Sequence, residues 1–348
     1  VLIVPAWIMK YYILDLSPKN SLVKYLTDLG HTVFMISWKN PTAEDRDVTM
    51  DGYLSLGVLA ALDAINKVVP KRKVHGVGYC IGGTLLAIAA AAMAQKEDDR
   101  LATVTMFAAQ TDFSEPGELS VFISPAQLAM LEALMWKKGV LESGQMGGAF
   151  QMLRTYDLLW SPSVATYLKG ERTGVNDLMS WNADGTRMAY RMHTDYLHQL
   201  YLNNDLAEGR YVALGETLDL AAVDAPMFVV GTETDHVAPW QSVYKVGKLV
   251  RSKDYTFCLT SGGHNAGIIS GPVHPRRRHR VLTMKAGARL PSPAQYMRKV
   301  EPVQGSWWPT FAAWPVEHST KTKGAPPKMG AAGYKPVCDA PGEYVLAR

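Results

Sequence analysis

Hydrophobic and polar residues alternate with two different periods along most of the chain. Short apolar runs rich in β-branched residues predict buried strands at 1–6, 31–38, 74–78, 102–110, 225–235 and 255–264. Between them, apolar residues at helical spacing predict helices at 21–29, ending at Gly30, and at 51–68. Strands that alternate with helices are typical of a mostly parallel sheet covered by helices. The pattern therefore predicts an α/β fold.

This alternation stops between residues 114 and 209, where the sequence becomes helical and rich in Met, Trp and Tyr; its clearest helix lies within 124–141. A long insertion after a middle strand suggests a helical cap over the site of an α/β-hydrolase fold. We therefore expect a core formed by 1–113 and 210–291, with 114–209 as the cap. Residues 292–348, rich in Pro and Gly, are expected to be an irregular segment packed on the core.

Composition and charge narrow the class of protein only slightly. The 348 residues are 47% hydrophobic and 20% charged, and no apolar run is long enough to predict a membrane-spanning helix. The net charge of +4 is too small to indicate nucleic-acid binding. We expect the basic run at 276–280 to be a solvated loop, the alternative being a contact for an anionic substrate. The chain begins at Val1, inside a predicted strand, so we expect a fragment of a longer protein.

Cys80 stands at the most informative position in the sequence. It lies between Gly78 and Gly82, directly after a predicted strand and before an alanine-rich helix. Gly-x-Ser-x-Gly in this context marks the nucleophile elbow of α/β-hydrolases, so Cys80 is a candidate nucleophile. The alternative is a packed small residue, which is what we expect of Cys258 within its strand. Three widely spaced cysteines indicate neither a disulfide framework nor a CxxC site, and a reducing compartment fits them best.

Two further residues complete a candidate catalytic triad. Asp235 and His264 follow Cys80 in the order acid then base, and each comes at the end of a predicted strand. The backbone N–H of Ile81 is the expected oxyanion donor, with a second donor from the loop around 6–10. His236 is either a second donor or substrate contact, or a polar loop residue. His75 is expected to be packed inside its strand, and no metal site is indicated.

The sulfur of Cys80 suggests which chemistry the site performs. A cysteine exchanges an incoming thioester for another thioester at little net free-energy cost, so the acyl group stays activated for attack by an alcohol or amine. A serine would form a less reactive oxygen ester. The choice of cysteine therefore favours acyl transfer from a thioester donor, although hydrolases with Cys, His and Asp also exist.

Several motifs together resemble polyhydroxyalkanoate synthases, and the class I type most closely. They are "KYYILDL", "HTVFMISWKNP", "GYCIGGT", "TDFSEPGELSVF", "WNADGTRM", "LYLNNDLAEGRY", "TETDHVAPW", "SGGHNAG" and "GSWWP". The likeness runs nearly end to end. It implies an α/β-hydrolase-fold domain that polymerises (R)-3-hydroxyacyl-CoA, with short monomers expected, into polyester and releases CoA. No other cofactor is implied.

The resemblance also implies partners, a location and residue roles. Such enzymes are cytoplasmic homodimers that act at the surface of polymer granules, and neither nucleic acid nor a transmembrane segment is involved. By position, Cys80 matches the nucleophile and His264 the base. Asp235 matches the third member, to which activation of the attacking 3-hydroxyl is often assigned. His236 and Trp181 match a histidine beside that acid and a tryptophan of the cap region, both candidate substrate contacts.

One position departs from the family pattern. Met9 stands where the family commonly has Asn, before "KYY". A Met side chain cannot donate a hydrogen bond, so any role of that side chain in binding the oxyanion or substrate is lost or taken elsewhere. Two alternatives to a synthase therefore stay open: a Cys-His-Asp thioesterase or other hydrolase, and a non-catalytic, granule-associated homologue.

Overall fold

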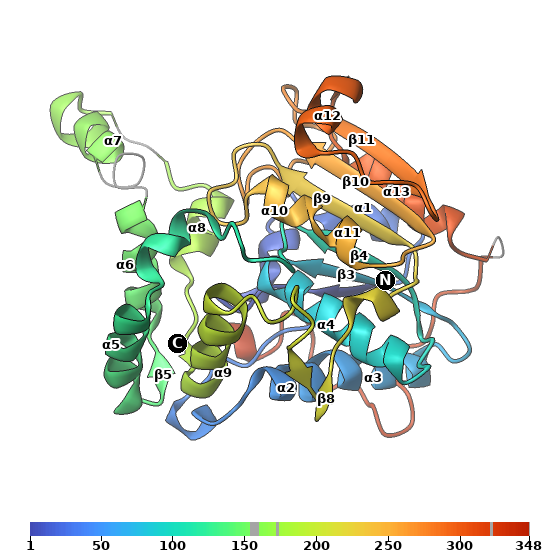
Figure 1. Cartoon of the computed structure of the whole chain (residues 1–348), viewed down its shortest axis with the longest axis horizontal. Coiled ribbons are helices and arrows are strands. Elements are labelled where there is room, and N and C mark those ends of the chain that lie inside the picture. The colour runs from blue at the N-terminus through green and yellow to red at the C-terminus, as the bar shows by residue number, and fades with distance from the viewer. Residues whose placement is uncertain (154–159, 172–173, 321–322, 348) are drawn as a thin grey trace.

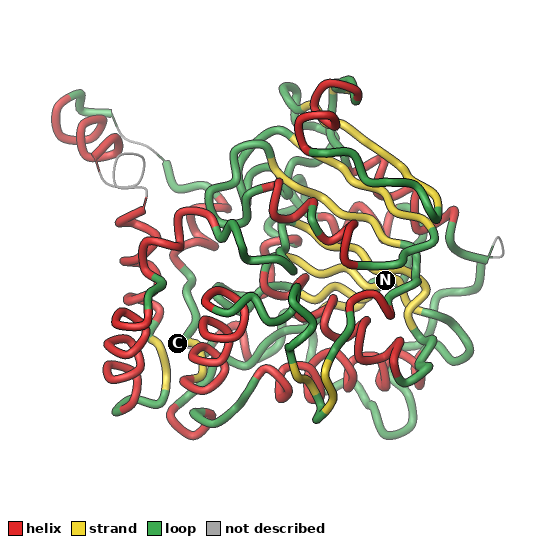
Figure 2. The backbone as a smooth tube through the Cα atoms, viewed as in Figure 1, coloured by secondary structure: helices red, strands yellow, loops and turns green. Residues whose placement is uncertain are grey.

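An eight-stranded sheet forms the centre of the computed structural model, which describes residues 1–153, 160–171, 174–320 and 323–347 (Figures 1 and 2). The strands lie in the order β12-β11-β10-β9-β4-β3-β1-β2, parallel from β2 to β10 and antiparallel from β10 to β12. Their bounds are β1 Leu2–Val4, β2 Phe34–Met35, β3 Val74–Tyr79, β4 Leu101–Phe107, β9 Met227–Thr232, β10 Asp254–Thr260, β11 Arg278–Lys285 and β12 Val303–Gln304. The mostly parallel sheet confirms the predicted α/β class.

The helices of the core follow the predicted pattern. Ser21 caps α1, Leu22–Asp28, by accepting from the Lys24 N–H at 2.8 Å, and Gly30 follows with a φ of 92°. The helix predicted at 51–68 is confirmed as one continuous helical run. Its parts are α2 Met50–Gly52, the π-helical η3 Tyr53–Leu59 and α3 Ala60–Val68. The strand predicted at 31–38 is shorter, since β2 pairs with β1 only at Phe34 and Met35.

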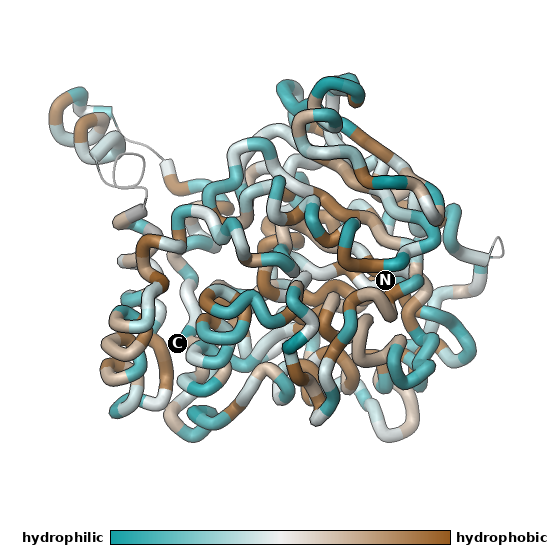
Figure 3. Tube along the Cα trace, in the orientation of Figure 1, coloured by the Kyte–Doolittle hydropathy of each residue, from teal (hydrophilic) through white to brown (hydrophobic). Residues whose placement is uncertain are grey.

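Helices cover both faces of the sheet. The buried α4, Ile81–Gln95, packs on β3 and β4. In Figure 1, α10 and α11 lie in front of the sheet, whereas α1 and α13 lie behind it. Figure 3 shows the hydrophobic residues concentrated along the central strands. The remaining elements of this part are η1 Tyr11–Leu14, η2 Ala43–Asp45, β7 Val212–Ala213, β8 Glu216–Thr217, η8 Leu220–Ala222, α10 Trp240–Tyr244 and α11 Val246–Leu249.

The region expected to be a cap is mostly helical. The helix foreseen within 124–141 is α5, Pro125–Trp136. The region's elements are η4 Gly117–Phe122, α5, β5 Val140–Leu141, α6 Ser143–Leu153, α7 Ser161–Ser163, the π-helical η6 Val164–Leu168, α8 Asp177–Ala183, β6 Met188–Ala189, α9 Tyr190–Tyr196 and the π-helical η7 Leu197–Leu202. The exact division into core, cap and C-terminal segment stays a prediction. Residues 154–159 and 172–173 of the cap, and 321–322 and 348 of the C-terminal segment, lie outside the described residues.

Two expectations about the last third of the chain are wrong. The basic run at 276–280 is not simply a solvated loop, because Arg278 begins β11 and pairs with Gln304 of β12. His279 is buried, with its ring nitrogens 3.1 Å from the Gly305 carbonyl oxygen and from Thr310 Oγ1. Alternating exposure along an antiparallel edge of the sheet explains how such a charged run can form a strand.

The segment from residue 292 is also more regular than expected. It contains α12 Pro293–Lys299, β12, α13 Trp308–Glu317 and η9 Tyr344–Leu346. Trp307 is fully buried, and its ring centroid lies 4.9 Å from that of Phe107 in β4. The ring centroid of Phe311 in α13 lies 5.1 Å from that of Phe107 as well. These aromatic contacts join the segment to the hydrophobic core. Within the described residues, no helix has the length and apolar character needed to cross a membrane.

Candidate active site

Cys80 lies at the tight turn between β3 and α4. Its backbone has φ 54° and ψ −129°, a left-handed conformation that costs a non-glycine residue free energy and is typical of a nucleophile elbow. Its N–H donates to the Phe107 carbonyl at 2.9 Å, and its carbonyl accepts from the Gly83 N–H at 2.8 Å. Cys80 is partly exposed and directly follows β3 at the carboxyl edge of the sheet.

The glycines around Cys80 are required by close backbone contacts. A Cβ on Gly78 would lie 2.4 Å from the Gly83 Cα, and one on Gly82 would lie 2.3 Å from the Val4 carbonyl oxygen. Any side chain at these positions would push α4 away from β3 or β1. The elbow therefore forms only because this part of the sequence lacks side chains where the backbones meet.

Asp235 is held in the loop after β9 with both carboxylate oxygens occupied. Oδ1 accepts from the N–H groups of Val237 at 2.9 Å and Ala238 at 2.8 Å, and Oδ2 accepts from the Thr232 hydroxyl at 3.0 Å. Burial would raise the pKa of Asp235. The positive charge of His264 and these hydrogen bonds outweigh that effect, so the pKa lies below its usual value and the carboxylate is ionised.

His264, in the glycine-rich turn after β10, joins the acid to the thiol. Its Nδ1 lies 2.8 Å from Asp235 Oδ2, and its ring also makes a side-chain hydrogen bond with Cys80. Burial would lower the pKa of His264. The charges of Asp235 and Cys80, together with the two hydrogen bonds, raise it well above 6.5. The structure thus brings Cys80, His264 and Asp235 into one chain of contacts, with an imidazole able to move a proton to or from sulfur.

Ile81, the candidate oxyanion donor, and His236 lie next in sequence to Cys80 and Asp235. Ile81 is the first residue of α4, where backbone N–H groups have no carbonyl partner within the helix. His236 directly follows Asp235 and is half-buried. A pocket of about 460 Å³ opens beside these two residues. Its lining residues are Gly117, Glu118, Thr234, Asp235, His236 and Pro239.

Met9 and Trp181 lie together, at the contact between the loop after β1 and the end of α8. Met9 forms an isolated antiparallel bridge with Gly185. The Trp181 side chain is buried, and its Nε1 donates to the Lys10 carbonyl at 2.7 Å. The indole N–H is therefore already used within the protein, which argues against its donating to a substrate.

Two tyrosines near the site carried no signal in the sequence. The Tyr196 and Tyr201 rings lie 5.3 Å apart and share a hydrogen bond, and Phe113 packs on Tyr201 at 4.7 Å. Burial raises the pKa of both phenols, and the charge of Cys80 adds to this effect. They are therefore within electrostatic reach of the candidate nucleophile. Only the fold brings these residues of α9 and η7 into electrostatic reach of Cys80, so no local motif could have identified them.

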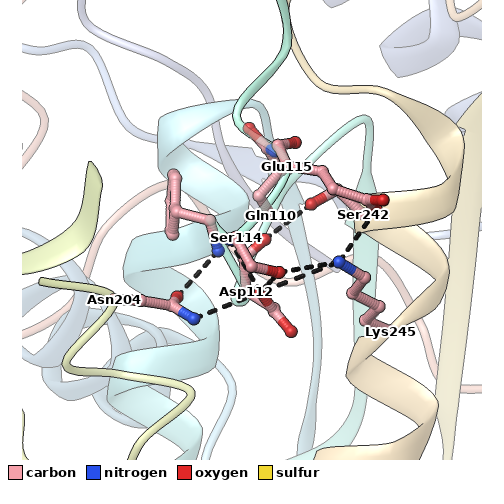
Figure 4. Close-up of polar contacts among 8 residues, drawn as sticks. Gln110, Asp112, Ser114, Glu115, Asn204, Ser242 and Lys245 are labelled. Atoms are coloured by element: carbon pink, nitrogen blue, oxygen red, sulfur yellow. Dashed lines mark hydrogen bonds and ion pairs between the residues drawn. The ribbon is translucent and has the colours of Figure 1, made fainter. Parts of the chain in front are cut away.

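A polar cluster fixes the two chain segments that lead into and out of the helical insertion (Figure 4). Asn204, after η7, accepts from the Phe113 N–H at 2.8 Å and donates to Asp112 Oδ1 at 3.2 Å. Lys245, at the end of α10, donates to the Ser114 hydroxyl at 2.8 Å. The cluster ties the insertion to the segment that follows the Asp235 loop. Across the described parts of the chain, no group of three or more His, Cys, Asp or Glu side chains could hold a metal ion.

Comparison with known proteins identifies the fold family of the chain. A family model described as the alpha/beta hydrolase fold matches residues 1–269. Among solved structures, a monoacylglycerol lipase from Paleococcus ferrophilus aligns with a TM-score of 0.49 at 12% identity, covering 91% of this chain and 94% of that one.

Curated relatives match along the whole chain. The poly(3-hydroxyalkanoate) polymerase subunit PhaC of Rhizobium meliloti is 38% identical over 348 residues, which are 100% of this chain and 56% of that protein. The corresponding subunit of Cupriavidus necator is 34% identical over 354 residues, covering 100% of this chain and 59% of that protein. The chain thus spans about half the length of the curated relatives it matches. The resemblance inferred from the motifs is confirmed, and the chain belongs to the α/β-hydrolase fold family as a relative of the poly(3-hydroxyalkanoate) polymerases.

Proposed function

We propose that this chain is the catalytic part of a polyhydroxyalkanoate synthase. It would join (R)-3-hydroxyacyl units from their CoA thioesters into a polyester and release CoA. The observation that carries the proposal is the match of the entire chain to named poly(3-hydroxyalkanoate) polymerases at 34–38% identity. The contacts among Cys80, His264 and Asp235 support it, because this arrangement suits acyl transfer through a thioester on sulfur.

In the first half of the proposed reaction, the Cys80 proton resides on His264, whose raised pKa favours the imidazolium, and the Cys80 thiolate attacks the thioester carbonyl. The Ile81 N–H donates to the oxyanion, with a second backbone N–H expected from the loop after β1. When the tetrahedral intermediate collapses, the bond to the CoA sulfur breaks, and His264 returns the proton to the leaving thiolate. The hydroxyacyl group is then bound to Cys80 as a thioester.

In the second half, the 3-hydroxyl group of another hydroxyacyl unit attacks the Cys80 thioester. His264 accepts the hydroxyl proton and gives it to the departing Cys80 sulfur. Asp235 orients His264 and balances its charge. Its buried carboxylate already accepts hydrogen bonds at both oxygens, which favours this role over direct removal of the substrate proton. CoA enters and leaves as part of the substrate, so the proposal includes no other cofactor and no metal.

The proposed setting is that of the family. We place the enzyme in the cytoplasm as a homodimer at the surface of polymer granules, with no nucleic-acid partner. Exposed apolar side chains on the helical insertion support an apolar partner, since soluble monomers rarely expose many of them together. They include Met130, Leu134 and Trp136 on α5, and Tyr167 and Leu168 on η6.

A substrate assay tests the function. The protein is incubated with (R)-3-hydroxybutyryl-CoA and with a medium-chain analogue, while released CoA is measured and polymer is recovered. We expect CoA and polymer together, with more turnover on the short substrate. Free CoA with only monomeric hydroxy acid would show a thioesterase instead. Unchanged CoA release by Cys80→Ala would exclude this site, whereas unchanged release by His264→Ala alone would displace only the base.

A further inference from the structure

Lys10 is a buried lysine that joins two distant parts of the chain. The residue is only 5% exposed, although a lysine is rarely buried without partners. Its ammonium group donates to the carbonyl of Tyr344 at 3.4 Å and also to the carbonyl of Ala347. Both acceptors belong to the C-terminal strap, defined as residues 323–347. Tyr344 lines the same groove as Ala189 of β6, so the strap meets the helical insertion there.

The backbone of Lys10 is held by the insertion. Its N–H donates to the Asp184 carbonyl at 3.3 Å, and its carbonyl accepts from Trp181 Nε1 at 2.7 Å. Thr186 extends this contact, because its N–H donates to the Ile8 carbonyl at 3.2 Å. The loop from residue 6 to residue 10 is therefore fixed between the end of α8 and the strap.

This loop continues directly from the backbone that touches the nucleophile elbow. Gly82, in the first turn of α4, packs so closely on Val4 and Pro5 that a Cβ there would lie 2.3–2.5 Å from their carbonyl oxygens. A shift of residues 6–10 would consequently alter the environment of the Ile81 N–H and the Cys80 thiol. The same loop is expected to supply the second oxyanion donor.

The end of the strap has several contacts that keep it in place. Asn40 Nδ2 donates to the Ala347 carbonyl at 3.5 Å, and Tyr344 forms part of the wall of an apolar groove that includes Trp38. If the strap were absent, the Lys10 ammonium would lose both carbonyl acceptors. Released from the strap, the side chain would turn toward water or toward the charge of Asp184, and it would no longer hold the loop in one position.

We propose that Lys10 is a positioning residue that couples the C-terminal strap to the loop beside Cys80. Docking of residues 344–347 fixes the Lys10 side chain, and the lysine fixes the loop in the geometry that acyl transfer requires. The inference rests on the proposed function for its effect on rate. The coupling itself is a property of the fold.

Four variants test this coupling: Lys10→Met, Lys10→Arg, a deletion of residues 343–348, and the deletion combined with Lys10→Met. We expect Lys10→Met and the deletion each to lower kcat for CoA release about tenfold, with KM changed less than twofold, because misplaced groups mainly lose rate. The combined variant should lose no more than either alone, since both remove the same contact. Lys10→Arg should recover much of the rate. Lys24→Met, which alters an exposed lysine of α1, should behave like the unaltered protein.

Hydrogen exchange of the peptide spanning residues 6–12 provides a readout independent of turnover. It should exchange faster in Lys10→Met and in the deletion, and to the same extent in both, while the peptides of β9 and β10 stay unchanged. Unaltered exchange, or rate losses that multiply in the combined variant, would overturn the coupling. If the unaltered protein released no CoA, the proposed function would fail, and the exchange data alone would decide the coupling.

Discussion

Individual hydrogen bonds decide the protonation states in the candidate site. Oδ1 of Asp235 accepts hydrogen bonds from two backbone N–H groups, and Oδ2 accepts from the side chains of Thr232 and His264. A group with this environment stays ionised although its side chain is fully buried. The charge then fixes His264 with Nδ1 toward Asp235, which leaves Nε2 for Cys80.

The first prediction concerns Asp235→Asn. The amide group of Asn would place N–H donors against either the backbone N–H groups or His264, so the histidine would lose its orientation. We expect CoA release to fall at least about a hundredfold with the fold retained. Steady-state assays and circular dichroism measure the two effects. His236→Gln is the neighbouring control and should lose much less. A loss below tenfold in Asp235→Asn would contradict the role assigned to the carboxylate.

The second prediction concerns the packing of the elbow. Gly82→Ala places a Cβ against the Val4 carbonyl oxygen, so the free energy of unfolding should fall by about 2 kcal/mol or more. Gly144→Ala in α6 is the matched control, because no atom lies within 4 Å of the added Cβ. The control should be neutral or stabilised by up to about 1 kcal/mol. Urea denaturation measures both, and equal effects would refute the argument from close packing.

At the scale of elements, His75 ties β3 to two other parts of the chain. Its Nδ1 lies 2.9 Å from Thr103 Oγ1 of β4, and its Nε2 lies 2.8 Å from Ser319 Oγ just after α13. Burial is the main reason that the pKa of His75 is lowered to about 4. The residue was expected to be packed within its strand, and this is confirmed. The strand contains a neutral imidazole that joins sheet and C-terminal segment.

The third prediction follows from this lowered pKa. Between pH 6.5 and 4 the unfolded state binds a proton at His75 that the folded state does not, so acidification through this range destabilises the fold. The full effect is about 3 kcal/mol. His75→Gln cannot titrate, so its stability deficit relative to the unaltered protein should shrink as the pH falls. Urea denaturation at several pH values measures the difference. A deficit that stays constant from pH 7 to 4.5 would show that His75 does not contribute to the acid sensitivity.

The elements that sequence could predict are those whose signal is local. The buried strands β3, β9 and β10 read as apolar runs, and Cys80, Asp235 and His264 each follow one of them, so their approach to one another follows from a parallel sheet. β11 begins in a basic run and α13 contains Pro309 and Pro315. Such residues disfavour a strand and a helix locally, so neither element was predicted. Their structure depends on pairing with β10 and on burial of the tryptophans against the core.

At the scale of the whole molecule, contacts between distant segments determine what surrounds the site. Tyr196 and Tyr201 feel the charge of Cys80 although they lie more than 115 positions further along the chain. Lys10 meets residues more than 330 positions away in the chain. No periodic pattern or motif in the sequence marks these residues, so their neighbours in the fold could not be predicted. The insertion also leaves large apolar side chains exposed, notably on the arm formed by residues 160–168, where α7 lies apart from the sheet (Figure 1).

The fourth prediction tests whether this arm contributes to the proposed homodimer. Tyr167 and Leu168 are 85% and 79% exposed, and burial of such side chains in an interface is worth roughly 1.5–3 kcal/mol each. Changing both to Ser should therefore weaken dimerisation by at least about tenfold. Sedimentation equilibrium over a range of concentrations measures the dissociation constant. The matched control changes Met329 and Val337 of the strap, which are 86% and 95% exposed, and should leave it unaltered. If the arm variant dimerises as tightly as this control, the interface lies elsewhere on the molecule.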